Sequence, residues 1–421
     1  MNSLLLITHE YPLKRGDASF IESEIQYLSE KFKKIYVFCL SKYRKDDDLL
    51  IMPKNVKVNF HVVNNGKIGK SILLLSLIFA PVFYQELFFL IKKKISVKVL
   101  YSMIVFLFYA ICLKMPIKRL LKANKDIALI YTYWYTQETL SVLLLKGLFD
   151  NIPCVTRTHG YDLYKFRNSL NYQPFKLWMD RKIDKIFFAS QHGYNYYLDE
   201  FARCDLKKYT VARLGIFNKY SIKVRKKAEN MTAFFMCSCS YIVSLKRIHF
   251  IINALEKIEE YRIHWVHIGD GTEENAIKSI ANEALRDKNN ISYEFKGFMT
   301  NEHIMEFYSE NYFDCFITTS ETEGGCPVSI SEAISFGIPV IATSVGGIPE
   351  IVNSDFGILL EADGNVLEIS KAIIELYNLS EDKKNVMRQS ARLFWESNFS
   401  ADVNHTKFLK ELLTVMKGNR K

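Results

Sequence analysis

Short apolar segments of strand length alternate with longer segments of helix length along most of this chain. In its first part the apolar segments are SLLLITHE, KIYVFCL, IALIYTYWY, PCVTRTHG and KIFFAS. Between the first two lies FIESEIQYLSEKF, whose apolar residues fall mainly on one face of a helix. Buried strands that alternate with helices are typical of a parallel sheet covered by helices. The pattern therefore predicts a doubly wound α/β domain.

The alternation loosens near residues 207–230 and then begins again. That stretch, KKYTVARLGIFNKYSIKVRKKAEN, ends in basic and polar residues and predicts a junction between two domains. Beyond it, MTAFFMCSCS, IHWVHIGDG, SYEFKGF, FDCFITTS and IPVIATS are predicted strands, and KRIHFIINALEKI is a predicted amphipathic helix. The pattern predicts two Rossmann-like halves, residues 1–212 and 213–395. Residues 396–421 are predicted to form a C-terminal helix that can cross back to the first domain.

Length and composition narrow the class of protein. The 421 residues suit two domains, and 49% hydrophobic with 24% charged residues is typical of a globular protein. The net charge of +10 is modest for this length and no repeat of aromatic and basic residues is present, so nucleic acid is not an expected partner. The eight cysteines are scattered without a CxxC pair, and the start, MNSLLLITHEYP, resembles a first strand more than a signal peptide. We therefore expect free thiols and a cytoplasmic location.

The segment of residues 71–122 does not follow the alternation. It contains SILLLSLIFAPVFYQELFFLI, which Pro81 interrupts, and VLYSMIVFLFYAICL, which has 15 residues. A helix that spans a membrane needs about 20 apolar residues. Nine basic residues and no acidic residue lie between Leu87 and Lys125, so the segment is predicted to lie on an anionic membrane surface. The alternatives are helices packed wholly inside the protein and a transmembrane hairpin.

The stretch TEGGCPVSISEA, residues 322–333, carries the most specific chemistry. It follows the predicted strand FDCFITTS and leads into the predicted helix VSISEAISFG, with Pro327 in its first turn and Gly337 as its stop. Ligands of open α/β sheets bind at the carboxyl ends of strands, and a helix N-terminus preceded by small residues attracts phosphate. Glu323 in the loop and Glu332 in the helix can accept hydrogen bonds from hydroxyls on two parts of one ligand. A sugar joined to a ribose through a diphosphate has this chemistry.

The longer stretch SETEGGCPVSISEAISFGIPVIATSVGGIPEIV resembles the signature of retaining glycosyltransferase family 4. That signature is usually written E-x7-E, whereas eight residues separate Glu323 from Glu332 here. Glu332 carries over directly. Glu323 carries over if the loop absorbs the extra residue as a bulge, and otherwise Glu321 takes its place. The resemblance covers nearly the whole chain and implies the GT-B fold, two Rossmann-like domains facing across a cleft.

Three further segments resemble parts of the same family. CSCSYIVSLKRIHFIINAL resembles a segment with a phosphate-binding basic residue, which is Lys246 here. Tyr241 stands where the family often has an arginine, and Arg247 can compensate for it. TRTHGYDLY resembles the histidine motif, which implies that His159 lies beside the reacting sugar, with Asp162 close by. RGDASFIESEI resembles the loop that closes over the donor phosphates.

The resemblance implies three sets of site residues. The catalytic set is His159, Lys246 and Glu323, and the acceptor-side set is His159 and Asp162. The donor-binding set consists of Gly16, Lys246, Arg247, Phe298, Glu323, Gly324, Gly325, Cys326, Pro327 and Glu332. No metal or cofactor is expected, because the nucleotide sugar is a substrate and Asp46–Asp48 lies in a polar loop far from the motif. Neither half carries GxGxxG after its first strand, which disfavours a dinucleotide oxidoreductase.

The function implied by the resemblance is transfer of a sugar, with retention at the anomeric carbon, from a nucleotide-sugar donor. The acceptor is a glycan or a lipid-linked glycan of bacterial surface polysaccharide, capsule or lipopolysaccharide synthesis. The C-terminal half is expected to hold the nucleotide, and the enzyme is expected to be peripheral on the inner face of the plasma membrane. Alternatives are phosphorylase-like transfer to phosphate and a catalytically inactive sugar-nucleotide-binding protein. A membrane-associated scaffold is a third, which leaves the C-terminal motifs unexplained.

Overall fold

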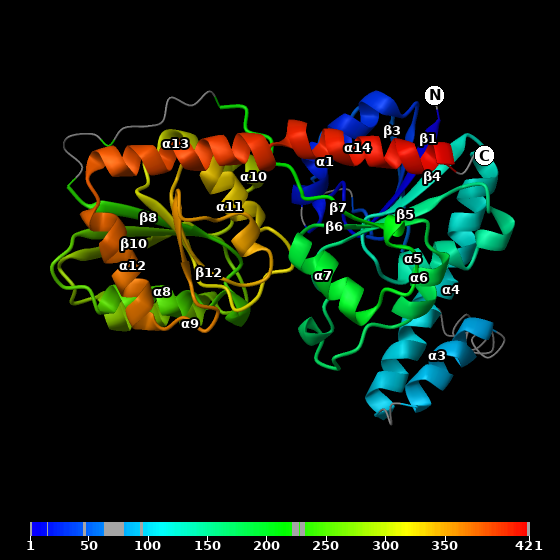
Figure 1. Ribbon diagram of the computed structural model, residues 1–421, viewed down its shortest axis with the longest axis horizontal. Coiled ribbons are helices and arrows are strands. Elements are labelled where there is room, and N and C mark those ends of the chain that lie inside the picture. The colour runs from blue at the N-terminus through cyan, green and yellow to red at the C-terminus, as the bar shows by residue number, and fades with distance from the viewer. Residues whose placement is uncertain are drawn as a thin grey trace. The chain divides into compact units, whose positions relative to one another are not determined.

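The computed structural model describes residues 2–14, 16–44, 48–62, 80–92, 96–220, 227 and 232–418. The chain forms two compact units (Figure 1). Unit 1 consists of Met1–Arg213 together with His405–Lys421, and unit 2 consists of Leu214–Asn404. Parts of the predicted membrane segment, residues 71–79 and 93–95, lie outside the described residues, as do Asp46 and Asp47.

Unit 1 contains a parallel sheet of seven strands in the order β3-β2-β1-β4-β5-β6-β7. The strands are β1 (Ser3–Thr8), β2 (Ile35–Cys39), β3 (Val56–Phe60), β4 (Ile127–Thr132), β5 (Cys154–Thr158), β6 (Lys185–Phe188) and β7 (Tyr209–Val211). Every residue of β1 and β2 is buried, as expected of continuous apolar strands in a covered parallel sheet. The order reverses between β1 and β4, and ligands of such sheets bind at the carboxyl ends of the strands beside this point.

Helices cover both faces of this sheet. The helices of unit 1 are α1 (Ala18–Lys31), α3 (Pro81–Ile91), α4 (Val97–Ala123), α5 (Gln137–Leu143), α6 (Lys176–Lys182), α7 (Gln191–Glu200) and α14 (Ala401–Gly418). Leu4 of β1 packs on the side of α1 and α14, and its neighbour Leu5 packs on the side of α4. Phe408 and Leu412 of α14 are buried in the first of these cores, so the last helix completes unit 1.

Helix α4 is longer than the 15-residue apolar stretch VLYSMIVFLFYAICL. It runs for 27 residues through Pro116 and carries a stripe of buried residues along one face. The stripe consists of Val99, Met103, Leu107, Ala110, Leu113, Ile117 and Leu121. This spacing of three or four residues is that of an amphipathic helix, and the stripe packs into the core of unit 1. Within the described residues α4 is the one helix long and apolar enough to cross a membrane, and 28% of its most apolar window is buried.

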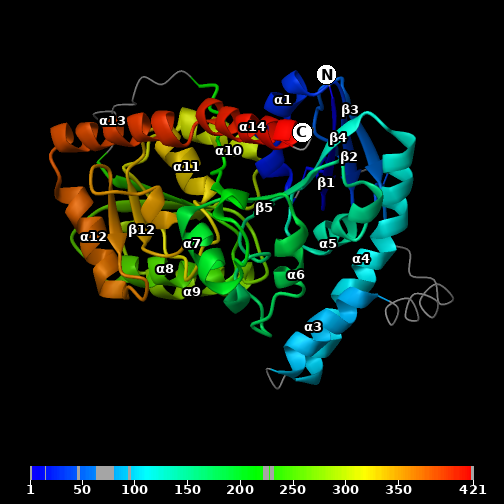
Figure 2. The ribbon, with the colours of Figure 1, turned by 45° about the vertical axis from the view of Figure 1, so that its right-hand side comes forward.

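Helix α3 and the first turns of α4 extend away from the sheet of unit 1 (Figure 2). Five large side chains on them are more than half exposed: Tyr84, Phe88, Ile91, Val97 and Tyr101. Glu86 of α3 is buried instead. Its carboxylate accepts hydrogen bonds from the Tyr172 hydroxyl (2.6 Å) and the backbone N–H of Phe175 (3.1 Å). The acid within the apolar sequence thus ties α3 to the loop before α6.

Unit 2 contains a parallel sheet of six strands in the order β10-β9-β8-β11-β12-β13. The strands are β8 (Phe234–Cys239), β9 (Ile263–Ile268), β10 (Ile291–Phe295), β11 (Cys315–Thr318), β12 (Val340–Thr343) and β13 (Gly357–Leu360). The helices are α8 (Ile248–Glu256), α9 (Glu274–Leu285), α10 (Asn301–Glu310), α11 (Val328–Ser335), α12 (Val366–Asn378) and α13 (Glu381–Asn398). Gly337 follows α11 with a left-handed φ of +69°. The prediction of two doubly wound parallel sheets is therefore confirmed.

Strands β3, β7 and β13 were not predicted. All three lie at sheet edges, and β7 and β13 have only three and four residues. Successive residues of β3 alternate between half-buried and exposed, so it lacks the continuous apolar run that marked the inner strands. The predicted end of the second domain, residue 395, falls inside α13, and the chain re-enters unit 1 only at His405.

Candidate functional site

The stretch around Glu323 forms a loop at the carboxyl end of β11 in unit 2. Pro327 is the N-cap residue of α11 and stands directly before its first turn. Two glycines of the loop after β12 approach this segment so closely that side chains would not fit. A Cβ atom on Gly346 would lie 2.0 Å from the carbonyl oxygen of Glu323, and one on Gly347 would lie 2.5 Å from the carbonyl carbon of Gly325. This glycine pair, which the sequence analysis did not single out, holds the acidic loop in place.

Lys246 and Glu323, both predicted site residues, form an ion pair within unit 2. The Lys246 ammonium donates a hydrogen bond to the Glu323 carboxylate, and the two side chains are 21% and 12% exposed. Lys246 ends a short 3-10 turn after β8. The backbone N–H of Glu321 donates to the carbonyl of Leu245 at 2.9 Å, which joins that turn to the loop. The structure thus brings a cation and an anion together at the ends of neighbouring strands.

Arg247 is bound to the backbone of the same region. It has a left-handed φ of +46°, and its guanidinium donates to the carbonyl oxygens of Thr319 (2.8 Å), Ser320 (3.1 Å) and Ala362 (3.1 Å). The resemblance implied that Arg247 compensates for a missing phosphate ligand. In the structure its hydrogen bonds fix the segment that leads into the acidic loop, and its role toward phosphate stays a prediction.

Glu332, on α11, is buried. The side-chain amide of Asn301, at the start of α10, donates a hydrogen bond to its carboxylate. Burial raises the pKa of Glu332 to about 8, and the bond from Asn301 opposes this rise. The carboxyl group is therefore mostly protonated at neutral pH and can both donate and accept a hydrogen bond. Glu321, the alternative to Glu323, is exposed.

The predicted donor residues do not all lie at one strand end. Gly324, Gly325 and Cys326 lie in the loop after β11. Phe298 follows β10, the strand at the edge of the sheet, and is 56% exposed. Gly16 belongs to unit 1.

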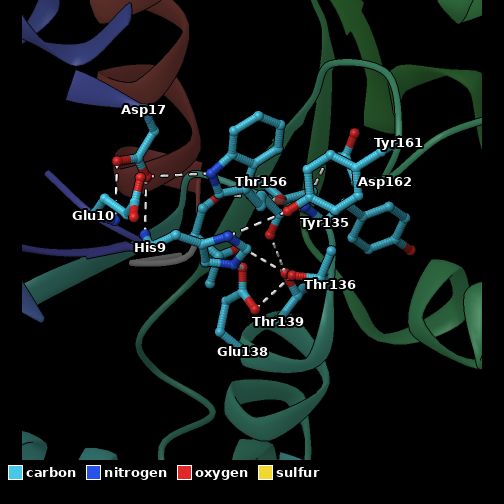
Figure 3. Close-up of polar contacts among 12 residues, drawn as sticks. His9, Glu10, Asp17, Tyr135, Thr136, Glu138, Thr139, Thr156, Tyr161 and Asp162 are labelled. Atoms are coloured by element: carbon cyan, nitrogen blue, oxygen red, sulfur yellow. Dashed lines mark hydrogen bonds and ion pairs between the residues drawn. The ribbon is translucent and has the colours of Figure 1, made fainter. Parts of the chain in front are cut away.

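In unit 1, Gly16 and Asp17 shape the loop after β1. Gly16 has a φ of +58°, and a Cβ atom there would lie 1.8 Å from a carboxylate oxygen of Glu10. The Asp17 carboxylate accepts several hydrogen bonds from the surrounding chain (Figure 3). It accepts hydrogen bonds from the backbone N–H groups of His9 (2.9 Å), Glu10 (3.0 Å) and Tyr11 (2.5 Å) and from the indole N–H of Trp134 (3.2 Å). Asp17 therefore fixes the backbone position of His9.

Asp162, predicted on the acceptor side, holds a second loop in the same way. Its buried carboxylate accepts hydrogen bonds from the backbone N–H groups of Tyr135 (3.0 Å), His159 (2.9 Å) and Gly160 (3.0 Å). Buried Lys176 donates to the carbonyl of Tyr135. Burial raises the pKa of Asp162, and this rise is opposed by the charge of Lys176 and by the backbone hydrogen bonds. Burial lowers the pKa of Lys176 to about 7. Asp162 thus positions the loop that carries His159.

His159 follows β5, and its ring packs among aromatic side chains. Its centroid lies 4.7 Å from that of Tyr133, with the rings stacked, and 4.4 Å from that of Trp134. In the described part of the chain, neither ring nitrogen has a hydrogen-bond partner. Burial and the nearby Arg157 guanidinium lower the pKa of His159 well below its ordinary value. The ring is therefore neutral and can donate one hydrogen bond and accept another.

His9 and Glu138 form a pair close to His159, also beyond the carboxyl ends of the strands (Figure 3). His9 Nε2 lies 3.0 Å from a carboxylate oxygen of Glu138, and the Tyr161 hydroxyl lies 3.2 Å from His9 Nδ1. Glu138 is fully buried, whereas the His9 side chain is 29% exposed. Burial lowers the pKa of His9, but the charge and hydrogen bond of Glu138, with the charges of Asp17 and Asp162, outweigh this effect and raise it. Three neighbouring strands, β1, β4 and β5, lead into these residues.

Comparisons with known proteins indicate the class of enzyme. Residues 221–394 match the family model of the glycosyl transferases group 1. An uncharacterized glycosyltransferase of Methanocaldococcus jannaschii is 28% identical over 279 residues, which cover 65% of this chain and 73% of that protein. This protein is a glycosyltransferase.

Two further relatives of this glycosyltransferase are informative. The putative colanic acid biosynthesis glycosyltransferase WcaL of Escherichia coli is 24% identical over 209 residues, which cover 48% of this chain and 50% of WcaL. The crystal structure of Anabaena HepE in complex with UDP and glucose has a TM-score of 0.66 at 16% identity, and the alignment covers 97% of this chain and 98% of HepE. The likeness shows that this glycosyltransferase has the GT-B fold.

The structure also places beside the predicted site residues six residues that the sequence analysis did not single out. They are His9, Glu138 and Tyr161 in unit 1 and Asn301, Gly346 and Gly347 in unit 2. A signal existed for His9, because it follows the first predicted strand directly, where ligands of such sheets bind. No group of three or more His, Cys, Asp or Glu side chains that could hold a metal ion occurs among the described residues.

Proposed function

We propose that this glycosyltransferase moves a sugar, with retention at the anomeric carbon, from a nucleoside-diphosphate sugar to a glycan or lipid-linked acceptor of bacterial surface polysaccharide. HepE, which was solved with UDP and glucose, and WcaL, which is named for colanic acid biosynthesis, support this proposal. The observation that carries it is the pairing of Lys246 with Glu323 in the loop before α11. A diphosphate is the natural partner of the cation, and sugar hydroxyls are natural partners of the anion.

In this proposal the donor separates the ion pair. Its diphosphate replaces Glu323 as the partner of the Lys246 ammonium. Lys246 then stabilises the negative charge that develops as the bond from the anomeric carbon to the phosphate oxygen breaks. Glu323 accepts hydrogen bonds from the sugar, and Glu332 binds the ribose. Hydrogen bonds to charged groups contribute roughly 1.5–3 kcal/mol each, and those between neutral groups roughly 0.5–1.5 kcal/mol, so the contacts of Glu323 should contribute more than those of the protonated Glu332. The acceptor hydroxyl attacks the face that the diphosphate leaves and gives its proton to the leaving phosphate oxygen, which preserves the configuration without a protein nucleophile.

We propose that transfer needs no divalent metal, because Lys246 stands where a cation would otherwise neutralise the diphosphate. Transfer in excess chelator should therefore match transfer without it. Activity lost to chelator and restored by magnesium or manganese would reject this part of the proposal.

A panel of nucleoside-diphosphate sugars, screened by thermal shift on the full chain, tests the donor class. A ligand at 100 times its dissociation constant should stabilise the fold by about 2.7 kcal/mol. The donors that bind are then incubated without acceptor, where slow hydrolysis is expected. Binding without any turnover would favour an inactive sugar-nucleotide-binding protein, and turnover that requires inorganic phosphate would favour a phosphorylase.

We also propose that α3 and the start of α4 rest on an anionic membrane surface at the cytoplasmic face. The exposed side chains Tyr84, Phe88 and Tyr101 support this, because aromatic and aliphatic groups insert at the boundary between headgroups and acyl chains. Lys92 lies over the ring of Phe88 at 4.4 Å. The basic residues of this region, with no acid between Leu87 and Lys125, favour anionic lipids.

Vesicle flotation tests this surface. Binding to vesicles that contain phosphatidylglycerol is expected at low salt, with release at high salt or in alkaline carbonate. Phe88→Ser combined with Tyr101→Ser should weaken binding, whereas Leu393→Ser, at an exposed apolar position of unit 2, should not. Extraction by detergent alone would favour an embedded hairpin, and no binding to any vesicle would reject the surface.

A further inference from the structure

We propose that unit 1 recognises the acceptor through a sugar ring, in a subsite formed by Tyr161, Trp134 and His9. This inference rests on the proposed function and deepens it, because it chooses a neutral sugar residue over a lipid phosphate as the group that unit 1 binds. The subsite lies where the loops after β1, β4 and β5 meet (Figure 3).

The three rings form a continuous aromatic surface. The centroids of Trp134 and Tyr161 lie 4.9 Å apart, and those of His9 and Trp134 lie 5.8 Å apart, with an interplanar angle of 24°. Tyr161 is 44% exposed, so its ring is available to a ligand. Aromatic rings combine an apolar face with a polar tip, which suits a sugar that presents C–H groups on one face and hydroxyls at its rim.

The pair of His9 and Glu138 supplies an oriented hydrogen-bonding group beside these rings. Because Nε2 of His9 faces the buried carboxylate of Glu138, the proton lies on Nε2 in the neutral ring and Nδ1 is the acceptor. The Tyr161 hydroxyl donates to Nδ1 at 3.2 Å in the free protein. A sugar hydroxyl can take over this bond, or bond to the Tyr161 oxygen, because it both donates and accepts. Glu138 does not touch the sugar and acts as a positioning residue.

The charges around His9 disfavour a phosphate ligand. Three carboxylates act on its imidazole, from Glu138, Asp17 and Asp162. Of the nearby cations, Lys176 is fully buried and bound to a backbone carbonyl, and Arg157 is fully buried and paired with Glu24 at 2.5 Å. A phosphate would meet these like charges, and the His9 imidazole, which can carry a positive charge, is already paired with Glu138, so phosphate binding is costly. A neutral hydroxyl-rich ring avoids that cost.

His159 adds a second, independent observation. Its ring contacts the same Trp134, and in the described part of the chain neither of its nitrogens has a hydrogen-bond partner. Buried polar atoms are normally satisfied, so an unsatisfied imidazole beside an aromatic surface indicates a place that a polar ligand completes.

The test uses the full-length enzyme and two classes of acceptor probe. Methyl glycosides of glucose, galactose and mannose represent a sugar acceptor, and undecaprenyl phosphate in micelles represents a phosphate acceptor. Saturation-transfer NMR measures binding of the glycosides. Calorimetry measures the affinity for UDP and so checks that unit 2 is intact. The variants are Tyr161→Ala, Tyr161→Phe, His9→Gln and Glu138→Gln. The matched control is His61→Gln, a histidine that follows edge strand β3 and stacks on Phe38.

At least one methyl glycoside is expected to bind, and Tyr161→Ala and His9→Gln should each weaken it at least tenfold. Tyr161→Phe, which keeps the ring, should have a smaller effect, and His61→Gln should have none. Glu138→Gln should lower the pKa of His9, followed by NMR, and raise the acceptor KM more than it lowers kcat. UDP affinity should be the same in all variants.

Two results would overturn the subsite. One is that no methyl glycoside binds while undecaprenyl phosphate does; the other is glycoside binding that Tyr161→Ala and His9→Gln leave unchanged. If the unaltered enzyme neither binds UDP nor turns over any donor, the result counts against the proposed function instead. The two failures are therefore distinguishable.

Discussion

Both units place polar side chains at the carboxyl ends of parallel strands, but they satisfy them in different ways. In unit 1 the carboxylates of Asp17 and Asp162 accept hydrogen bonds from backbone N–H groups and so hold loops in place. In unit 2 the Glu323 carboxylate is paired with the movable side chain of Lys246, and Glu332 receives a side-chain amide. Backbone partners cannot be exchanged for a ligand without unfolding a loop, whereas side-chain partners can. The difference indicates a rigid aromatic surface in unit 1 and exchangeable charges in unit 2.

The largest expected effect comes from removing the cation of unit 2. Lys246→Met should lower the rate of sugar transfer by about 10²–10³-fold, because the charge that develops on the leaving diphosphate loses its nearest stabilising group. Transfer kinetics with a saturating donor measure this. Lys257→Met, at an exposed lysine just beyond α8, is the control and should leave the rate unchanged. An unchanged rate in Lys246→Met would contradict the role of the ion pair.

A smaller effect separates the two glutamates of unit 2. Glu332→Gln should weaken free UDP and the sugar donor alike, because both carry the ribose. Glu323→Gln should spare free UDP and weaken only the full donor. Loss of one hydrogen bond corresponds to roughly 1.5–3 kcal/mol at Glu323, which is paired with a cation, or about ten- to a hundredfold in affinity. At the protonated Glu332 it corresponds to roughly 0.5–1.5 kcal/mol, or about two- to tenfold. Calorimetry with both ligands makes the measurement. If Glu323→Gln has no effect and Glu321→Gln abolishes transfer, Glu321 is the sugar ligand.

A third expected effect is on stability instead of activity, and it depends on pH. The pKa of Glu332 is about 8 in the folded protein because of burial, well above the ordinary value of 4.5. Between these two values the unfolded chain has released this proton while the folded protein retains it. The free energy of unfolding should therefore fall as pH rises through this window, by at most about 1.4 kcal/mol per pH unit from this group.

Glu332→Gln cannot ionise and should lose this dependence. Its Tm should fall less between pH 5 and pH 8 than that of the unaltered enzyme, and at pH 8 the variant should be the more stable protein, while its nucleotide affinity is lower. Thermal unfolding followed by circular dichroism at several pH values tests this. Glu283→Gln, at an exposed position of α9, controls for loss of a surface carboxylate. A Tm profile of Glu332→Gln that parallels the unaltered enzyme would contradict the prediction.

The two units also differ in what the sequence could predict. The acidic loop of unit 2 and α11 lie in one continuous stretch, so strand, loop and helix could be read in order from Cys315 to Ser335. The cluster of unit 1 combines His9, Glu138 and Tyr161. More than a hundred residues of sequence separate His9 from each of the other two. Only the strand order β1-β4-β5 makes them neighbours, and that order is a property of the assembled sheet.

Helix α4 shows a second reason why prediction fails. The apolar stretch VLYSMIVFLFYAICL ends at Leu113, and a proline inside a helix, such as Pro116, normally disfavours its continuation. The helix continues because Ile117 and Leu121 extend the buried stripe into the core of unit 1. Tertiary packing thus overrides the local preference, which a single sequence does not reveal. Glu86 is a similar case, since its acid is stabilised by Tyr172 from a distant loop.

The return of the chain to unit 1 has a consequence for the order of biosynthesis. The ribosome makes most of unit 1 first, then all of unit 2, and only then the part of α14 that carries Phe408 and Leu412. Until that helix emerges, the buried Arg157 lacks the Phe408 ring that lies 3.9 Å from its guanidinium, and the part of the sheet face that α14 covers stays exposed. Nascent unit 1 therefore exposes an apolar surface while roughly 190 codons of unit 2 are translated, which takes about 10–40 s at 5–20 residues per second. Chaperone binding during this interval is the expected companion of such an architecture.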